Sequence, residues 1–346
     1  MAFKLKYSKL SNFYLGTKKN FFTDNEALLS KARTINNLYG QQDVRTECKI
    51  CLSRLSTEVD FKSHGIGYKF CGVCGHLNGV HEDTKDFVEK VYISDDGDDY
   101  SNLYIDDSFV KRATDIYLPK LDFLSESLDG NSYSILDVGC GSGYFVHAAL
   151  HRGIQARGVD VSASMVDFGN TQISHNLNQA PLSFIDETSF YETIVNSTED
   201  VISAIGVLEH LREPHKFFKA FQKSSAEYLF YSVPMFSNSV YFEVMLQDVF
   251  PRQLSGGHTH LFVEESIKKM NSIIGVSPVA EWRFGTDVMD LYRMMMTRFN
   301  QIDVSDKFVQ LFEEGFNENI DSLQSVFDES HFCSEIHLVA RKIKSS

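Results

Sequence analysis

A glycine-rich segment in the middle of the chain constrains the fold most. Residues 134–145 read Ser-Ile-Leu-Asp-Val-Gly-Cys-Gly-Ser-Gly-Tyr-Phe, an apolar strand that enters a glycine turn and continues into an amphipathic helix over 144–152. Gly139, Gly141 and Gly143 let the backbone approach a ligand where any Cβ atom would collide. This order of elements predicts a ligand site at the carboxyl end of a parallel strand.

A dinucleotide-binding loop is the obvious alternative interpretation of these glycines, and the sequence disfavours it. The pattern G-x-G-x-x-G beginning at Gly139 requires Gly or Ala at its sixth position, where Tyr144 stands. Asp137, which precedes the glycines, would repel a pyrophosphate group. We therefore expect a ligand that carries positive charge.

Apolar strand patterns alternate with helical patterns after the glycine segment. Strands are expected at 156–162, 182–185, 200–206, 227–233, 279–285 and 335–343. Asp160 stands near the end of the first of these, where a carboxylate is well placed to accept hydrogen bonds from ribose hydroxyls. The alternation predicts an α/β fold with a parallel sheet and with ligands at the carboxyl ends of its strands.

The segments ILDVGCGSGYF, GVDVS and IGVLEHL, in this order, resemble a class I S-adenosylmethionine-dependent methyltransferase over about residues 131–235. The resemblance implies a methyltransferase with a Rossmann-like sheet of seven strands, mostly parallel with an antiparallel last strand, and with S-adenosylmethionine as its cofactor. It places the following residues around that cofactor: Asp137, Gly139, Gly141, Gly143, Asp160, Asp186, Glu187, Val207 and Glu209. Tyr104 is a further candidate, as part of a lid over the cofactor.

Four of the six cysteines have the spacing of metal ligands. Cys48 and Cys51 form one C-x-x-C pair, and Cys71 and Cys74 form a second pair after 19 intervening residues, which is within the window for structural zinc. Four thiolates would close a tetrahedron, so we expect one structural zinc per chain. A disulfide framework is disfavoured by the expected cytoplasmic location, and a redox pair leaves the second C-x-x-C unexplained. Three nearby histidines are possible replacement ligands: His64, His76 and His81.

A zinc module before a methyltransferase domain also resembles sugar C-methyltransferases of the deoxysugar type and their relatives in polysaccharide clusters. Those proteins carry a His-Glu-His-Leu-Ser-Tyr-like segment after the fifth strand, whereas this chain has Gly-Gly-His-Thr-His-Leu-Phe at 256–262. The difference leaves methylation at carbon, oxygen or nitrogen open. We expect a small-molecule acceptor, a sugar or nucleotide-linked sugar.

Methyl transfer to a hydroxyl group or a carbon acid needs a base, and histidine titrates near neutral pH. His210, His258 and His260 lie on loops after the fourth and fifth expected strands, and His260 is the preferred base, slightly ahead of His258. The sequence is equally compatible with His260 capping the next helix or packing on Phe262. A metal site formed by His258 and His260 lacks an obvious third ligand.

Charge and composition exclude some partners. The chain has 33 Lys and Arg against 47 Asp and Glu, a net charge of −14, which disfavours binding to nucleic acid or to an anionic membrane. No apolar run approaches the ~18 residues that span a bilayer, so we expect a soluble, cytoplasmic protein.

The expected organisation has four parts. They are an N-terminal extension over 1–43, a zinc ribbon over 44–82, an acidic linker and lid helix over 83–130, and the methyltransferase domain over 131–346, with an acidic helical insertion near 300–330. Two alternative functions are a methyltransferase that docks a protein or RNA on the zinc module, and a non-catalytic cofactor-binding scaffold. The sequence leaves the oligomeric state open.

Overall fold

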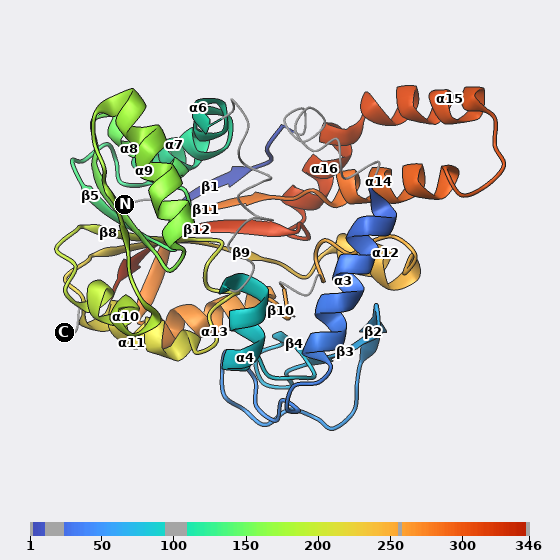
Figure 1. The fold of residues 1–346 in the computed structure, drawn as a ribbon, viewed down its shortest axis with the longest axis horizontal. Helices are drawn as coiled ribbons and strands as arrows, with labels where there is room; N and C mark the ends of the chain where they lie inside the picture. The colour runs from blue at the N-terminus through green and yellow to red at the C-terminus, as the bar shows by residue number, and fades with distance from the viewer. Residues whose placement is uncertain (1–2, 11–23, 94–108, 255–257, 344–346) are drawn as a thin grey trace.

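A central sheet organises the computed structural model, which describes residues 3–10, 24–93, 109–254 and 258–343 (Figure 1). Its strands are β1 (Lys4–Tyr7), β5 (Ser134–Val138), β6 (Gln155–Asp160), β7 (Leu182–Phe184), β8 (Val201–Ile205), β9 (Tyr228–Pro234), β11 (Val276–Phe284) and β12 (Glu335–Lys342). Within the described residues these eight strands join in the order β1-β11-β12-β9-β8-β5-β6-β7. β12 is antiparallel to both neighbours, β11 and β9, and the other neighbouring strands are parallel.

Helices cover both faces of this sheet (Figure 1). One face carries α6 (Phe109–Arg112), the π-helical turn η2 (Ala113–Tyr117), α7 (Leu118–Ser127), α8 (Tyr144–His151) and α9 (Ala163–Leu177). The other carries α10 (Glu187–Val195), α11 (Pro214–Lys223) and α13 (Glu264–Ile274). The parallel strands are therefore shielded on both sides, as α/β sheets require.

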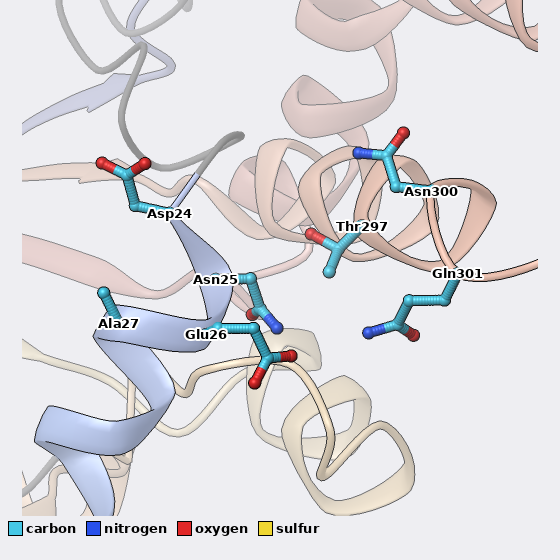
Figure 2. A pocket seen from close by; sticks show the side chains of 7 residues that line it. All are labelled: Asp24, Asn25, Glu26, Ala27, Thr297, Asn300 and Gln301. Atoms are coloured by element: carbon cyan, nitrogen blue, oxygen red, sulfur yellow. The ribbon is translucent and has the colours of Figure 1, made fainter.

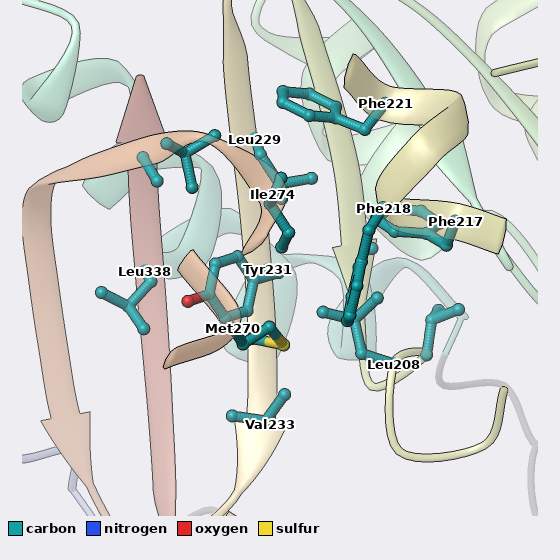
Figure 3. Packing of buried hydrophobic residues seen from close by; sticks show 14 of the residues in the cluster. Leu208, Phe217, Phe218, Phe221, Leu229, Tyr231, Val233, Met270, Ile274 and Leu338 are labelled. Atoms are coloured by element: carbon teal, nitrogen blue, oxygen red, sulfur yellow. The ribbon is translucent and has the colours of Figure 1, made fainter. Parts of the chain in front are cut away.

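The packing of α11 and α13 on β9 shows how one face is held (Figure 3). Phe217, Phe218 and Phe221 recur on one side of α11 and are fully buried. They lie beside Met270 and Ile274, which come from α13 and are also buried. Each such side chain contributes about 1.5–3 kcal/mol by leaving water, so this interface anchors the strands that end at the site described below.

A second, smaller sheet lies beside the first. It consists of β2 (Phe61–Ser63), β3 (Ile66–Phe70), β4 (Leu77–Gly79) and β10 (His260–Leu261), in the antiparallel order β10-β4-β3-β2. The helix α3 (Asn25–Tyr39) packs on it through Tyr39, which is buried with Tyr68 and Leu261. The short helix α4 (Lys85–Val88) and the turn η1 (Glu89–Ile93) follow. β10 is about 180 residues away in sequence from β4, its partner. The small sheet therefore joins the N-terminal part of the chain to the segment that follows β9 of the central sheet.

Four helices complete the C-terminal half: α12 (Asn238–Met245), α14 (Asp287–Phe299), α15 (Asp306–Asn317) and α16 (Ile320–Glu329). α15 and α16 lie in the region near 300–330, where a helical insertion was expected. Met289 and Met294, both on α14, are buried. A hollow between the start of α3 and the end of α14 is lined by polar residues such as Asn25 and Thr297 (Figure 2). It includes neither the glycine turn nor the cysteines.

Two strands differ from the sequence expectation. The sheet was expected to have seven strands, and β1, from the expected N-terminal extension, adds another beside β11. The cysteine-bearing module was expected to lie within 44–82, but its sheet takes β10 from residues 260–261. Both strands are too short to be recognised by alternating hydrophobicity. None of the helices in the described parts of the chain has the length and apolar character needed to cross a bilayer.

Candidate active site

The glycine turn between β5 and α8 lies directly against the end of β8. Gly139 and Gly143 have φ angles of +66° and +75°, in the left-handed region that favours glycine. A Cβ atom on Gly139 would lie 2.6 Å from Cγ2 of Val207, and one on Gly143 would lie 2.6 Å from Cδ1 of Leu182. Both positions therefore require glycine, and Val207 lies beside the turn.

Asp160 connects the end of β6 to the same turn. One oxygen of its carboxylate accepts a hydrogen bond from the backbone N–H of Gly141 at 2.7 Å, and the other accepts one from Ser162 at 2.8 Å. Burial raises the pKa of Asp160, and these backbone donors oppose the rise. A carboxylate has further lone pairs, so the side chain is still able to accept hydrogen bonds from a ligand.

Asp137 is the most deeply placed acid at the turn. It is buried on β5 and accepts a hydrogen bond from the Ser203 hydroxyl at 2.6 Å. Burial raises its pKa to about 7, against the effect of the Ser203 hydrogen bond. A cationic ligand beside Asp137 would stabilise the ionised form and so lower this pKa.

The acidic pair expected near the adenine ring lies at the surface. Asp186 caps α10, because its Oδ1 accepts hydrogen bonds from the Thr188 hydroxyl at 2.6 Å and from the Ser189 N–H at 2.7 Å. These bonds lower the pKa of Asp186 to about 2. Glu187 lies 3.7 Å from the guanidinium of Arg212. Asp186 therefore has a structural task that the sequence analysis did not assign to it.

Glu209, His210 and His258 come together after β8. One ligand atom from each of these side chains lies within 4.8 Å of the other two. Glu209 is only 5% exposed, and its Oε2 has no hydrogen-bond partner among the described residues. Burial raises the pKa of Glu209 to about 8. Burial lowers the pKa of His258 to about 4, so its imidazole is neutral at neutral pH.

His260, the preferred base from the sequence, occupies a different kind of place. It is fully buried, its Nε2 lies 3.0 Å from the backbone oxygen of Glu209, and its Nδ1 lies 2.8 Å from Nε2 of His76. Since a carbonyl oxygen only accepts, Nε2 of His260 donates to Glu209, and His76 then donates to Nδ1. With both ring nitrogens engaged, this geometry does not favour His260 as a base, and it makes His260 a link between the small sheet and the loop after β8.

The four predicted metal-binding cysteines converge. The sulfur atoms of Cys48 and Cys74 are 3.7 Å apart and those of Cys51 and Cys71 are 3.5 Å apart, with all four within 4.8 Å of one another. None of the four forms a disulfide. Zinc–sulfur bonds of about 2.3 Å put the sulfurs of a tetrahedral site about 3.8 Å apart, so the cluster has the dimensions of a zinc site.

Comparisons with known proteins agree with this geometry. Residues 109–280 match the family model described as a methyltransferase domain. These residues form a class I S-adenosylmethionine-dependent methyltransferase domain. A ubiquinone biosynthesis O-methyltransferase from Coxiella burnetii is 26% identical over 102 residues, 29% of this chain, and the chain spans 42% of that relative's length. Magnesium protoporphyrin IX methyltransferase from Synechocystis PCC 6803, solved with bound SAH, has a similar fold, with a TM-score of 0.50 and 14% identity over 75% of this chain and 100% of that one.

The methyltransferase fold and, for the domain at 109–280, the enzyme class predicted from the sequence are thereby confirmed, and S-adenosylmethionine is the cofactor of this class. The described residues suit that cofactor. A cradle at Gly139 and Gly143 leaves no room for side chains, and the buried acids Asp137 and Asp160 flank it. A positively charged ligand with ribose hydroxyls would satisfy both acids. Tyr104, the expected lid residue, lies outside the described residues.

Two charged residues that act on the pKa of Glu209 were missed by the sequence analysis. Lys120 of α7 is 7% exposed, and its positive charge acts on the pKa of both Asp137 and Glu209, against the effect of burial. Glu335, at the start of β12, lies 2.6 Å from Nε2 of His337, a contact that keeps the pKa of Glu335 well below its usual range although its side chain is partly shielded from water. A lysine within the apolar stretch at 117–121 was the available signal for Lys120.

Proposed function

We propose that this chain transfers the methyl group of S-adenosylmethionine to a hydroxyl group of a small-molecule acceptor of the sugar or nucleotide-linked sugar type. The observation that carries the proposal is the group formed by Glu209, His210 and His258. Glu209 follows by two positions Val207, whose side chain lies against Gly139 of the glycine turn. A hydroxyl group must lose its proton during methylation, and this group is where the chain places proton acceptors.

The cofactor supplies a methyl group bound to a positively charged sulfur. On our proposal, Asp160 accepts hydrogen bonds from its ribose and Asp137 faces its cationic methionine part. Gly139, Gly141 and Gly143 keep the turn close to the cofactor, Val207 packs on it, and Asp186 and Glu187 lie toward the adenine. The chain's main contribution is then to hold the acceptor in line with the carbon–sulfur bond and to exclude water.

His210 and His258 are the proposed proton-handling residues. The neutral imidazole of His258 is the form that accepts a proton, and its partly buried position suits an acceptor drawn out of water. His260 is proposed as a positioning residue, because its hydrogen bond to the Glu209 backbone holds in place the loop that carries Glu209 and His210.

We also propose one structural zinc held by Cys48, Cys51, Cys71 and Cys74. The sulfur separations and the absence of disulfides among these residues support it. With four protein ligands the zinc has no open coordination position, so its task is to hold the small sheet. Thiols that must stay reduced fit the cytoplasm, which we keep as the proposed location.

A small acceptor is favoured over a protein or RNA by how the cysteine module is used. Three of its cysteines pack within the same core as β8 and β9, and His76 contacts His260. The module is therefore part of the wall behind the site, and the net charge of −14 opposes RNA. The sugar class rests on the resemblance of the two-module order to sugar methyltransferases.

The test is a methyl-transfer assay on the full chain with isotopically labelled S-adenosylmethionine. Acceptors would be a panel of nucleotide-linked sugars, with free sugars, total RNA and a protein mixture in parallel. We expect label in one or more sugars, with the product's NMR spectrum showing a methyl group on oxygen. Label only in RNA or protein, or a carbon-bound methyl group, would contradict the proposal. Cofactor binding measured by calorimetry without turnover on any acceptor would favour the scaffold alternative.

A further inference from the structure

The three side chains after β8 have the composition of a metal site. We infer that Glu209, His210 and His258 hold a divalent transition-metal cation beside the methyl donor, distinct from the zinc proposed for the four cysteines. The inference deepens the proposed function and rests on it for its chemical purpose, because the cation would bind the acceptor's hydroxyl oxygen. The binding of the cation is measurable without any acceptor.

The spacing of the ligand atoms supports a single ion. Bonds from a cation to imidazole nitrogen and carboxylate oxygen are about 2.0–2.2 Å long, so two ligands on one ion lie up to about 4.3 Å apart. Nε2 of His210 and Oε1 of Glu209 are 3.9 Å apart, and the full group lies within 4.8 Å. Small side-chain rotations would therefore bring all three onto one ion.

The carboxylate of Glu209 gives an independent reason to expect a ligand. Its side chain is 5% exposed, and its Oε2 has no hydrogen-bond partner among the described residues. A buried polar atom without a partner costs about 1–3 kcal/mol, and more when it is charged. A cation in front of Glu209 would remove this cost.

Hydrogen bonds behind the ligands orient them as in known metal sites. Nδ1 of His258 lies 3.2 Å from the backbone oxygen of Gln253, so Nδ1 carries the proton and Nε2 keeps its lone pair. A bond from the distal nitrogen to a carbonyl is the usual support of a metal-binding histidine. On the other side, His260 holds the backbone oxygen of Glu209 at 3.0 Å. His258 and the Glu209 loop are thus both fixed from behind.

The ligand set indicates the kind of cation. Two imidazoles and one carboxylate suit Fe²⁺, Co²⁺ or Zn²⁺ better than Mg²⁺ or Ca²⁺, which prefer oxygen ligands. Three protein ligands also leave coordination positions open for a substrate. Such a site differs in kind from the closed cluster of four cysteines.

The open positions would serve methyl transfer as follows. The acceptor's hydroxyl oxygen binds the cation, which lowers the hydroxyl's pKa, and the proton passes to water. The resulting oxygen anion attacks the methyl carbon, the new O–CH₃ bond forms, and the old S–CH₃ bond breaks with its electron pair staying on sulfur. No oxidant or further reactant is needed. With the cation bound, His210 and His258 act as its ligands instead of accepting the proton themselves as proposed above, and the cation takes over the task of activating the hydroxyl group.

Cobalt titration tests the inference on the full chain as purified, with zinc left in the cysteine cluster. We expect calorimetry to show one Co²⁺ site per chain, with visible absorption typical of nitrogen and oxygen ligands. Thiolate-to-cobalt absorption alone would mean exchange into the cysteine cluster and would overturn the inference, as would the absence of binding.

Variants locate the site. Glu209→Gln and His258→Asn are expected to weaken Co²⁺ binding at least tenfold while zinc content stays at the wild-type value. The matched controls Glu192→Gln and His175→Asn change exposed residues of α10 and α9 and should bind Co²⁺ like the wild type. Equal affinity in all five proteins would place the cation elsewhere and contradict the inference. Circular dichroism would confirm that the variants fold, and His210→Asn, whose side chain is 28% exposed, offers a variant with less effect on packing.

The outcomes separate this inference from the proposed function. Co²⁺ binding at these residues without methylation of any sugar would leave the metal site standing and contradict the acceptor class. Methylation of a sugar at an unchanged rate after removal of all cations except the cysteine-bound zinc would support the acceptor class and contradict the inferred metal site.

Discussion

The four-cysteine cluster and the Glu209–His210–His258 group lie in one molecule and contrast in how they are built. The cysteines form two sequence-local pairs of identical ligands that close a coordination sphere. The second group has one carboxylate and two imidazoles from two distant loops, and one oxygen of the buried carboxylate has no hydrogen-bond partner in the described parts of the chain. The first arrangement suits a structural task, and the second suits a ligand that exchanges. His76 and His260 connect the two regions through a 2.8 Å contact.

Loss of a cysteine ligand should have the largest effect. For Cys74→Ser we expect the chain to lose its zinc and the small sheet to unfold, because the binding free energy of a structural zinc, about 10–16 kcal/mol in small zinc-finger peptides, is also folding free energy. Metal analysis and thermal unfolding measure this. Cys333→Ser, which changes a lone buried cysteine, should keep the zinc. A Cys74→Ser protein with wild-type zinc content would contradict the assignment of the four cysteines as a closed zinc site.

Removal of Asp160 should have the next largest effect, on the cofactor and not on the metals. Asp160→Ala should weaken S-adenosylhomocysteine binding by about 10- to 100-fold, since hydrogen bonds to charged groups contribute about 1.5–3 kcal/mol. Calorimetry on the folded variant gives the number. The exposed Asp167→Ala, on α9, is the control. Unchanged affinity in Asp160→Ala would refute the assignment of the ribose to this residue.

Cofactor binding should depend on pH through Asp137. Burial raises the pKa of Asp137 to about 7, and a cationic ligand needs the ionised form. Affinity for S-adenosylmethionine should therefore fall as pH drops below about 7, by up to about tenfold per pH unit. In the free chain the sign is opposite: this group's contribution to stability falls as pH rises from its ordinary pKa of 3.8 to about 7.

Calorimetry at pH 6, 7 and 8 measures this dependence. The variant Asp137→Asn should show a much flatter profile, because it has no proton to exchange at this position. A wild-type profile that is equally flat would show that Asp137 does not face the cationic part of the cofactor.

Removing the His76–His260 connection between the two regions should have the smallest effect on the chain's stability. His260→Leu should destabilise the chain by about 2 kcal/mol, the usual net value of two hydrogen bonds, because His76 and the Glu209 backbone lose their shared partner. Urea unfolding measures it. Zinc content should stay unchanged while Co²⁺ affinity falls by a smaller factor than in Glu209→Gln. Equal losses in the two variants would mean that His260 is itself a ligand.

The sequence predicted those features whose residues are close together in the chain. The glycine turn, Asp160 at the end of β6 and the paired cysteines are local patterns, and the mostly parallel sheet follows from them through the methyltransferase resemblance. The base was harder to predict, because His258 and His260 are separated by a single residue and yet differ in surroundings. Only the pairing of β10 with β4 places His260 in the interior. The third partner of His258 and His210 is Glu209, which was expected to contact the cofactor and which becomes a metal-ligand candidate only through the fold.

β1 and Lys120 illustrate the remaining gap. β1 is four residues long and reads Lys-Leu-Lys-Tyr. Nothing in this composition predicts that the segment pairs with β11. Lys120 is a lysine in a helix, where exposure is the normal expectation. Its burial depends on the packing of α7 on the sheet, a tertiary effect that the apolar neighbours at 117–121 suggest without specifying.

The contrast between a closed and an open metal site is tested most directly by anomalous diffraction from crystals of the full chain grown with S-adenosylhomocysteine and Co²⁺. Data collected at the zinc and cobalt absorption edges distinguish the two metals. We predict a zinc peak among Cys48, Cys51, Cys71 and Cys74 and a separate cobalt peak among Glu209, His210 and His258. A cobalt peak confined to the cysteines, or none at Glu209, would contradict the account.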